Sequence, residues 1–385
     1  MNNFTYYAPT KIIFGKDCIK SLKEELSVYG NNILLAYGGG SIKKSNLYDT
    51  IITLLDGFNI FELSNIEPNP RIESVRKGIS ICKANNINVV LAIGGGSVID
   101  CSKVVAAGYY YDKDAWDLVL NPDLITNALP IVSVLTLAAT GSEMNKNAVI
   151  SNMDENRKKG TSSNCMIPKV SFLDPTYTFT LPKLQTAAGA ADIMSHLFEN
   201  YFQKATDCYV QDTIAEGLLK TVIKYAPIAI EDPTNYSARS NIMWASSLAL
   251  NGLTAAGKGG SWSCHAIEHE LSAYYDITHG VGLAIITIAW MRYILNDATV
   301  NKFAKYAENI FDIHDNDKYK QASLGIDATK NFFLSIGLPS KLSEVGIDES
   351  KLKLMSKQAY LHGNVRNGYV SLNEEDIYNI LLMCK

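Results

Sequence analysis

Residues 89–108, VVLAIGGGSVIDCSKVVAAG, contain the change of pattern that decides the fold of the first half of this chain. An apolar, β-branched run ends at Ile93, three glycines follow, and a helical pattern begins near Ser97. Glycines let a backbone approach a ligand closely, and a helix N-terminus offers free N–H groups and the positive end of its dipole. The stretch therefore predicts a buried strand, an anion-binding turn at Gly94–Ser97 and a helix. A plain tight turn has the same layout.

Outward from this stretch, β-branched runs alternate with helical patterns throughout the first half of the chain. The expected strands are KIIFG, NNILLAYGGGS, GFNIFELSNI, NVVLAIGGGSVID and LPIVSVLTLAATGSE, with helices over SNLYDTIITLL and NPRIESVRKGISICKANN. Such alternation predicts a parallel sheet covered by helices. From Gln185 onward almost every segment has helical spacing. We therefore expect a Rossmann-like α/β dinucleotide-binding domain over residues 1–182 and an all-α metal-binding domain over residues 183–385.

The tetrad GGGS occurs twice, at Gly38–Ser41 and Gly94–Ser97. A duplicated mononucleotide-binding half and repeated use of one turn solution both explain the repeat, and neither copy has the usual G-x-G-x-x-G spacing. NAD-dependent enzymes tend to carry an acidic residue after an early strand, where it bonds the ribose. The first tetrad has no carboxylate, and Lys43 and Lys44 follow Ser41. This composition favours NADP(H) over NAD(H), although a solvated helix start explains the two lysines equally well.

Four side chains in the second half indicate a metal site. Asp192 and His196 are four residues apart in AADIMSHLFEN, which places them one turn apart on one helix face. His265 and His279 lie in WSCHAIEHELSAYYDITHGVG, and the two stretches hold four of the six histidines. One carboxylate and three imidazoles suit Fe²⁺ or Zn²⁺ with a position left open for substrate. The alternative is ordinary polar groups on helix surfaces. Cys264 is a further soft donor, but as the helix neighbour of His265 it is expected to point elsewhere.

Composition excludes several classes of function. The 385 residues are 47% apolar and 19% charged, with a formal net charge of −4 and no basic excess for nucleic acid. The longest apolar run, residues 281–291, is too short to span a bilayer and predicts a buried helix after His279. Seven scattered cysteines without a C-x-x-C pair fit reduced thiols. With no signal-peptide layout at the N-terminus, we expect a cytoplasmic protein.

Taken together and in this order, YGGGSIKK, IEPNP, AIGGGSVID, TLAATGSEMN and HAIEHELSAYYDITHG resemble the iron-containing (group III) alcohol dehydrogenase family. Within it they resemble the branch of NADPH-dependent aldehyde reductases and butanol dehydrogenases, and the resemblance extends from FTYYAPTKIIFGK to LNEEDIYNIL. It implies a homodimer, with the NFTYYAP segment as an edge strand that pairs between subunits.

The resemblance also implies a set of site residues. The metal ligands would be Asp192, His196, His265 and His279, and His269 would lie near the substrate. Lys158 is expected to bond the nicotinamide ribose, with the adjacent Lys159 as the alternative. The implied cofactor contacts are Gly39, Gly40, Ser41, Asn69, Gly95, Gly96, Ser97, Asp100, Thr136, Thr140, Asn145, Asn147, Lys158 and Tyr177.

The reaction implied is hydride transfer between NADP(H) and a small aliphatic aldehyde or primary alcohol, with the metal polarising the carbonyl oxygen. His269, water or a ribose hydroxyl would supply the proton. Three other functions were weighed. An NAD-dependent zinc polyol dehydrogenase would carry an acidic residue near Ser41, and this sequence has none there. A dehydroquinate synthase-type lyase needs several cations, and the metal-bearing segments offer only Lys258. A metal or nucleotide sensor would need a partner-binding tail, repeat or charge run, and none is present.

Overall fold

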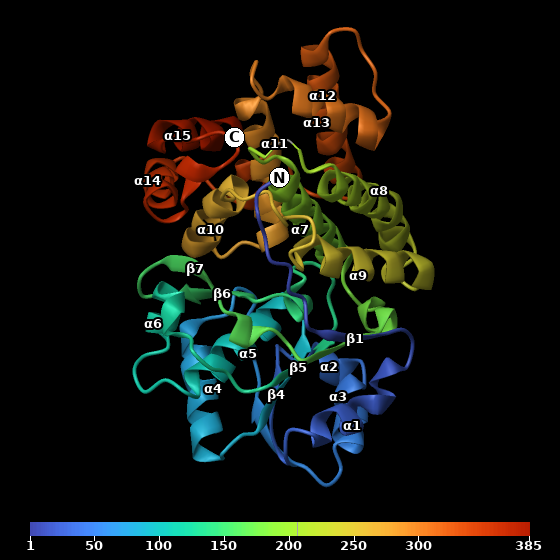
Figure 1. Cartoon of the computed structure of the whole chain (residues 1–385), viewed down its shortest axis with the longest axis vertical. Coiled ribbons are helices and arrows are strands. Elements are labelled where there is room, and N and C mark those ends of the chain that lie inside the picture. Colours follow the sequence, from blue (N-terminus) through green and yellow to red (C-terminus); the bar gives the residue numbers. More distant parts are fainter. Residues whose placement is uncertain (206) are drawn as a thin grey trace. The chain divides into compact units, whose positions relative to one another are not determined.

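The computed structural model describes residues 1–205 and 207–385, which divide into two compact units (Figure 1). The sheet unit comprises Tyr7–Leu181 and Pro233–Ser247, and the helical unit comprises Met1–Tyr6, Pro182–Asp232 and Leu248–Lys385. The expected domains, 1–182 and 183–385, stay a prediction. The observed units differ from them at Pro182 and in two short segments, residues 1–6 and 233–247.

A parallel sheet forms the centre of the sheet unit. Its order is β1-β8-β5-β4-β2-β3, and every adjacent pair is parallel. The strands are β1 (Lys11–Phe14), β2 (Asn32–Tyr37), β3 (Asn59–Leu63), β4 (Val89–Gly94), β5 (Ile131–Leu135) and β8 (Val170–Leu173). The first five lie within the expected strands. The sequence analysis missed β8, which is four residues long and lies between β1 and β5.

Helices cover both faces of this sheet, because successive side chains of a strand point to opposite faces. Ile33 and Leu35 of β2 pack with α1 (Leu22–Ser27), α2 (Ser41–Lys44) and α3 (Leu47–Leu54). Leu34 and Ala36 pack with α4 (Ile72–Ala84), α5 (Gly96–Gly108) and α6 (Trp116–Leu120) on the other face. Figure 1 shows α4 and α3 on opposite sides of the strands. The expected Rossmann-like α/β fold is confirmed.

An antiparallel hairpin, β6 (Asn147–Asn152) and β7 (Arg157–Ser162), follows β5 and was not expected from the sequence. It lies against the segment before α4. The Ser151 amide donates to the Pro70 carbonyl over 2.8 Å, and the backbones of Arg71 and Ser151 form an isolated parallel β-bridge. The hairpin carries Asn147 and Lys158, two of the implied cofactor contacts.

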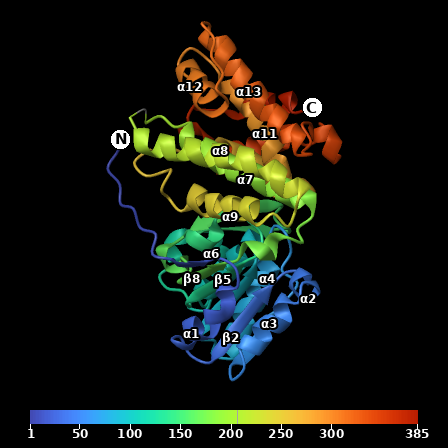
Figure 2. The ribbon, with the colours of Figure 1, turned by 90° about the vertical axis from the view of Figure 1, so that its right-hand side faces the viewer.

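The helical unit is built around α7 (Lys183–Tyr201), which packs against α8 (Tyr209–Glu231) and α11 (His279–Ile294). Figure 2 shows α7 and α8 side by side. The other helices of this unit are α10 (Ser263–Tyr275), α12 (Val300–Phe311), α13 (Lys318–Ser335), α14 (Leu352–His362) and α15 (Glu374–Met383). A ninth helix, α9 (Tyr236–Leu250), belongs mainly to the sheet unit. The expected helix after His279 is confirmed as α11.

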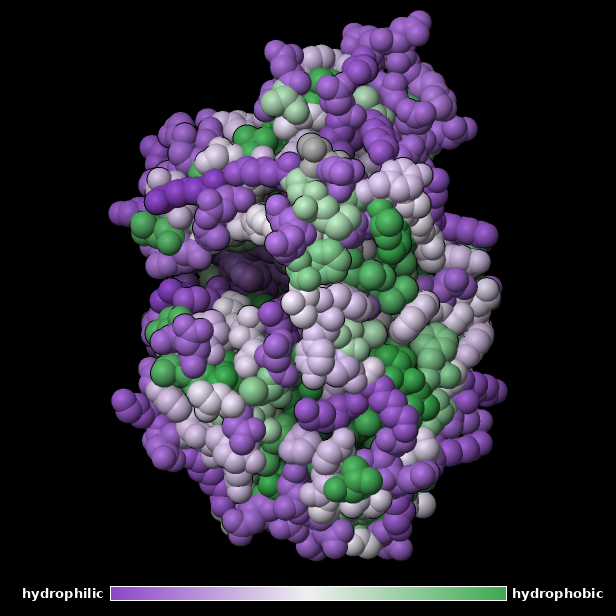
Figure 3. Space-filling model, in the orientation of Figure 1, coloured by the Kyte–Doolittle hydropathy of each residue, from purple (hydrophilic) through white to green (hydrophobic). Residues whose placement is uncertain are grey.

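Helix α12 shows how the outer helices are amphipathic. Its buried residues recur at helical spacing and include Phe303 and Tyr306, and the Phe303 ring stacks on Phe202 with the two centroids 4.3 Å apart. On the face shown in Figure 3, hydrophilic residues cover most of the surface over α12 and α13. No helix among the described residues has both the length and the apolar character needed to cross a membrane.

The first residues of the chain pack on the helical unit. The Asn2 amide donates to the Gly257 carbonyl over 2.8 Å, and the Asn2 side chain donates to the Lys258 carbonyl over 3.1 Å. Residues 3–9, which were expected to form an edge strand, are not in a strand in this single chain. The homodimer therefore stays a prediction.

Candidate metal centre and dinucleotide-binding turns

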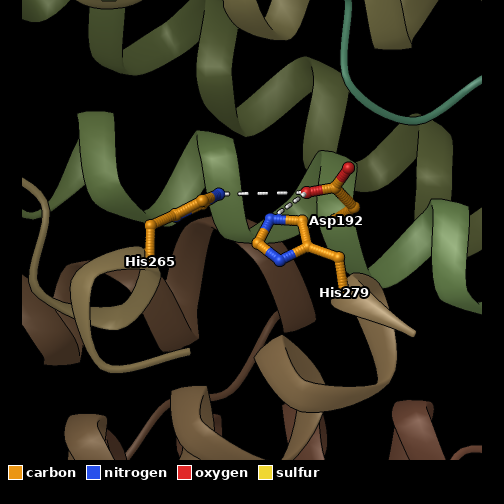
Figure 4. A group of neighbouring side chains, drawn as sticks. All are labelled: Asp192, His265 and His279. Atoms are coloured by element: carbon orange, nitrogen blue, oxygen red, sulfur yellow. Dashed lines mark ion pairs between the residues drawn. The ribbon is translucent and has the colours of Figure 1, made fainter. Parts of the chain in front are cut away.

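Three helices bring three of the four expected metal ligands, Asp192, His265 and His279, into one group of possible ligand atoms, and the fourth, His196, lies beside Asp192. Asp192 and His196 lie one turn apart on α7, with Asp192 Oδ1 3.4 Å from His196 Nε2. His265 lies in the first turn of α10, and His279 is the first residue of α11. Asp192 Oδ1 is 3.8 Å from His265 Nε2 and 3.8 Å from His279 Nε2. Figure 4 shows the carboxylate facing both imidazoles.

The donor atoms of this cluster fit a bound cation. Asp192, His196 and His265 are buried, and Asp192 Oδ1, His196 Nδ1 and His265 Nε2 have no hydrogen-bond partner among the described residues. Buried polar atoms are normally paired, because leaving them unpaired is costly. A divalent ion would satisfy Asp192 Oδ1 and His265 Nε2 at once. The side chain of His279 is 23% exposed, so the site opens toward this residue.

The burial and the close spacing of these charged groups shift their pKa values. Burial works against the charge on Asp192, but the neighbouring histidines outweigh it and lower the pKa of this carboxyl well below its usual range. Burial lowers the pKa of His196 to about 4. Burial also opposes charge on His265, yet the nearby carboxylates of Asp192 and Glu199 outweigh it and raise the pKa of His265 to about 9. A metal would have to displace that proton, because imidazoles ligate in the neutral form.

Two buried glutamates support the ligating histidines, and the sequence analysis missed both. Glu199 Oε1 lies 3.3 Å from His265 Nδ1 and accepts the His265 amide over 2.9 Å. Glu268 contacts Nδ1 of His279 and accepts the Ser272 hydroxyl over 2.5 Å. A carboxylate on the outer ring nitrogen fixes the tautomer and points the other nitrogen at the metal. The available signal was their position: each glutamate follows a ligating histidine by three residues on the same helix.

We expect the Glu199→Gln variant to bind its metal on the order of 10- to 100-fold more weakly, because the neutral amide orients His265 without raising its basicity. Competition with a chelator measures this affinity. Glu216→Gln is the matched control, since Glu216 is a carboxylate of the same unit that accepts from Tyr201 and Asn309 over 2.8 Å each. Equal losses in the two variants would contradict the role of Glu199.

His269 and Cys264 take different places around the centre. The His269 ring centroid is 5.7 Å from that of His279 on the partly exposed side of the site. Cys264 is buried, and burial raises the pKa of its thiol. No described metal-ligand group includes Cys264, in agreement with the expectation that it points elsewhere.

In the sheet unit, the two GGGS tetrads lie where two neighbouring strands end, on the carboxyl-terminal side of the parallel sheet. Strands β2 and β4 are neighbours, and Tyr37 at the end of β2 pairs with Ile93 near the end of β4, so both tetrads lie at the carboxyl ends of adjacent strands. The chain runs from β2 to β3 on one side and then returns past β2 to β4, which makes this the topological switch point. Open α/β sheets bind ligands at such a point.

The glycines of the second tetrad are needed for close packing. A Cβ added to Gly96, the first residue of α5, would lie 2.4 Å from Thr140 Oγ1, and one at Gly95 would lie 3.1 Å from Leu137 Cβ. In the first tetrad, by contrast, a Cβ on Gly39 or Gly40 would meet nothing within 4 Å, so there is open space over that turn. Gly40 has a φ of 98°, and Ser41 begins α2.

The structure brings several implied cofactor contacts together. Lys158 Nζ donates to Asn69 Oδ1 over 3.0 Å, whereas Lys159 Nζ donates to the Leu120 carbonyl over 3.2 Å. Lys158 is therefore the lysine that accompanies Asn69. The Thr136 amide donates to the Gly94 carbonyl over 3.0 Å, which places Thr136 beside the second tetrad.

Three other implied contacts make hydrogen bonds within the protein, and one packs on its core. Asp100 is buried and accepts the Ser142 hydroxyl over 2.5 Å and the Val149 amide over 2.9 Å. The Asn145 side chain accepts the Asn147 amide over 2.8 Å and donates to the Gly141 carbonyl over 2.8 Å. Tyr177 is partly buried against the core on the α1–α3 face. Ser97 lies in the first turn of α5.

A carboxylate that the sequence analysis did not connect with the first tetrad lies on the neighbouring strand. Glu62 of β3 accepts the hydroxyls of Tyr37 and Tyr48 over 2.5 Å each. Lys43 Nζ lies 4.5 Å from the Tyr48 ring centroid and 5.2 Å from that of Tyr37. Lys43 thus packs against the two tyrosines that hold Glu62.

A dinucleotide-type switch point together with a carboxylate–imidazole metal centre defines the class of metal-dependent dehydrogenases. The chain belongs to the iron-containing alcohol dehydrogenase family: the iron-containing alcohol dehydrogenase model matches residues 9–175, and the model of the family's C-terminal part matches residues 186–384. The family resemblance and the two-part fold expected from the sequence are thereby confirmed, as is an alcohol dehydrogenase or aldehyde reductase activity.

Three relatives illustrate the similarity. The chain is 57% identical to NADH-dependent butanol dehydrogenase A of Clostridium acetobutylicum over 99% of both chains. It is 38% identical to the NADPH-dependent aldehyde reductase YqhD of Escherichia coli over 96% of this chain and 95% of the relative. The crystal structure of NADH-dependent butanol dehydrogenase A from Thermotoga maritima superposes with a TM-score of 0.96 at 40% identity, covering 100% of this chain and 99% of the other.

The position of Lys258 argues further against the lyase. Its ammonium donates to Asp212 Oδ1 over 2.6 Å and to the Asn200 carbonyl over 2.8 Å. Lys302 contacts the second oxygen of Asp212. The cation that the lyase would need for an acidic substrate is thus buried in an internal ion pair.

Proposed function

We propose that this protein reduces small aliphatic aldehydes such as butanal to primary alcohols, and catalyses the reverse oxidation, with NADP(H) and one divalent ion, Fe²⁺ or Zn²⁺. The observation that carries the proposal is the meeting of Asp192 with three imidazoles, in which the buried atoms Asp192 Oδ1 and His265 Nε2 have no hydrogen-bond partner among the described residues. The names of the butanol dehydrogenase relatives support the choice of substrate.

In this proposal Asp192, His196, His265 and His279 hold the metal, and the turns at Gly38–Ser41 and Gly94–Ser97 hold the dinucleotide. When bound, the ion supplies Lewis acidity to the carbonyl oxygen and the reduced nicotinamide supplies the hydride. Glu199 and Glu268 accept a hydrogen bond from the outer N–H of His265 and His279, which leaves the inner nitrogen of each ring unprotonated and directed at the ion. The α5 N-terminus directs its free N–H groups toward the diphosphate.

The preference for NADP(H) rests on the first tetrad. The Gly38–Ser41 turn contains no carboxylate and has open space above Gly39 and Gly40, and Lys44 is exposed beside it. A 2′-phosphate would find a hydroxyl and a cation here. The relatives that are 57% and 52% identical are named NADH-dependent, and the one that is 38% identical is named NADPH-dependent, so the cofactor has to be measured directly.

The test follows the absorbance of NADPH and, separately, NADH with butanal, using metal-stripped protein before and after adding Fe²⁺ or Zn²⁺. We expect oxidation only after metal is restored, with a higher kcat/KM for NADPH. A higher kcat/KM for NADH would reject the cofactor preference and leave the metal proposal standing. If no aldehyde reduction follows the addition of either metal, the proposed function is wrong.

We further propose that His269 delivers the proton to the alcohol product, since it is partly exposed and lies beside His279. His269→Ala is expected to lower kcat for aldehyde reduction on the order of a hundredfold. The wild-type rate should fall with rising pH as His269 loses its proton, and this limb of the pH profile should disappear in the variant. An unchanged rate and pH profile would assign the proton to water or a ribose hydroxyl.

A further inference from the structure

Lys103 is a fully buried lysine in the middle of α5, with a relative exposure of 0%. Its ammonium has three protons and three acceptors: Ser142 Oγ at 2.8 Å, Asn145 Oδ1 at 3.0 Å and the Asn147 carbonyl at 2.7 Å. All three acceptors lie between Thr140 and Asn147, in the segment that connects β5 to the hairpin. Lys103 therefore ties this segment to α5.

Helix α5 places Lys103 on the same face as Gly96, which belongs to the glycine turn at Gly94–Ser97. Gly96, Asp100 and Lys103 occupy positions i, i+4 and i+7 of α5 and so share one face. Each meets the same segment: Gly96 leaves room for Thr140, Asp100 accepts from Ser142, and Lys103 donates to Ser142 and Asn145.

From Lys103 the contacts continue to Thr140. Asn145 Nδ2 donates to the Gly141 carbonyl over 2.8 Å, and the Ser142 amide donates to Thr140 Oγ1 over 3.2 Å. Gly141 has a φ of 57° and makes the tight turn between them. Thr140 thereby lies against Gly96 at the first turn of α5. The position of Thr140 beside this turn depends on a segment whose central donor is Lys103.

Charge balance explains why the central donor is a lysine. Asp100 is buried, Glu143 is fully buried, and the charge on Lys103 acts on both. Glu143 Oε1 accepts the Ser247 hydroxyl of α9 over 2.5 Å, and Ser133 and Ser171 connect the segment to β5 and β8 through the Glu143 carbonyl. Removing the ammonium would take one hydrogen bond from each of the three acceptors and withdraw a cation from two buried carboxyl groups.

We propose that Lys103 is a positioning residue for dinucleotide binding, which holds the Thr140–Asn147 segment in the shape that completes the site at the α5 N-terminus. This inference rests on the proposed function, because it takes the tetrad at Gly94–Ser97 as the dinucleotide site. Lys103 itself is buried beneath the segment and does not touch the ligand.

The experiment measures the Kd of NADPH and of NADH from the fluorescence of the reduced nicotinamide, on the full-length, metal-loaded protein. In Lys103→Met the Kd of the tighter-binding dinucleotide should rise about tenfold or more. The metal content should stay unchanged, because the four metal ligands lie in the other unit. Ser142→Ala removes only one of the three acceptors and should raise the Kd by a smaller factor, roughly threefold.

Lys258→Met is the matched control, since it also removes one buried ammonium, here from the ion pair with Asp212 in the helical unit. It is expected to lower Tm but to leave the dinucleotide Kd within about twofold of wild type. Equal increases of the Kd in Lys103→Met and Lys258→Met would overturn the proposal, as would an unchanged Kd in Lys103→Met. If Lys103→Met does not fold, an unchanged Kd in Ser142→Ala overturns it. Wild-type protein that binds neither dinucleotide would instead refute the proposed function.

Discussion

The His265→Ala variant is expected to lose its metal and to reduce butanal with a kcat/KM lower by on the order of a thousandfold or more. His265 Nε2 is buried, unpaired and 3.8 Å from Asp192 Oδ1, so its removal takes one of the three imidazoles from the cluster. The backbone should persist, because Glu199 still accepts the amides of Ser263 and of residue 265, each over 2.9 Å. Metal content after dialysis and the kinetics of butanal reduction together check the prediction.

Cys264→Ala is the matched control for this variant. Cys264 is the preceding residue, is also buried and carries a soft donor, but it belongs to neither group of possible metal ligands among the described residues. We expect this variant to keep its metal and to lose about 1 kcal/mol of stability from the small cavity. Full metal retention in His265→Ala, or metal loss in Cys264→Ala, would show that the ligand set is wrong.

The second large effect is expected from a single methyl group at Gly280. A Cβ at this position would lie 2.0 Å from the carbonyl oxygen of Ala188 and 2.6 Å from its carbonyl carbon. These are backbone atoms of α7, so no side-chain rotation relieves the overlap and α11 has to move away from α7. His279 precedes Gly280, and Asp192 lies one turn beyond Ala188, so the displacement separates two metal ligands.

Gly280→Ala is therefore expected to lower the free energy of unfolding by about 3 kcal/mol and to weaken metal binding more than about tenfold. Denaturant unfolding and chelator competition measure the two effects. Gly217→Ala is the control, because a Cβ at Gly217 meets nothing within 4 Å and the residue lies inside α8. Alanine there should stabilise the protein by about 0.5–1 kcal/mol. Wild-type stability and metal affinity in Gly280→Ala would contradict the close approach of the two helices.

Much of the metal centre was predictable because its signals are local. The four-residue spacing of Asp192 and His196 is one helical turn, and the stretch from His265 to His279 encodes two helices joined by a short connection. The partners of the histidines were not predictable in this way. Helical spacing does not predict that Glu199 of α7 contacts His265 of α10, because the two residues are 66 positions apart and come together only when the helices pack.

In the sheet unit, too, local features were predicted from the sequence and long-range contacts were not. The strand, glycines and helix of residues 89–108 were predicted, because apolar runs, glycine turns and helix starts are properties of adjacent residues. The four residues of β8 were missed, because their identity as a strand comes from pairing with residues 11–14 and 132–134. The role of Lys103 was also missed, since in sequence it is one lysine among apolar residues.

The sequence by itself determined the α/β and helical halves and the two glycine turns, and it pointed to four candidate metal ligands, because each follows from periodicity or residue chemistry within a short window. Only the tertiary structure decided that both turns share the switch point between β2 and β4, that Glu199 and Glu268 support the ligands, and that Lys103 supports the Thr140–Asn147 segment. The physical reason is that burial and hydrogen-bond partners arise from contacts between residues far apart in the chain. Those contacts exist only after the helices and strands have packed.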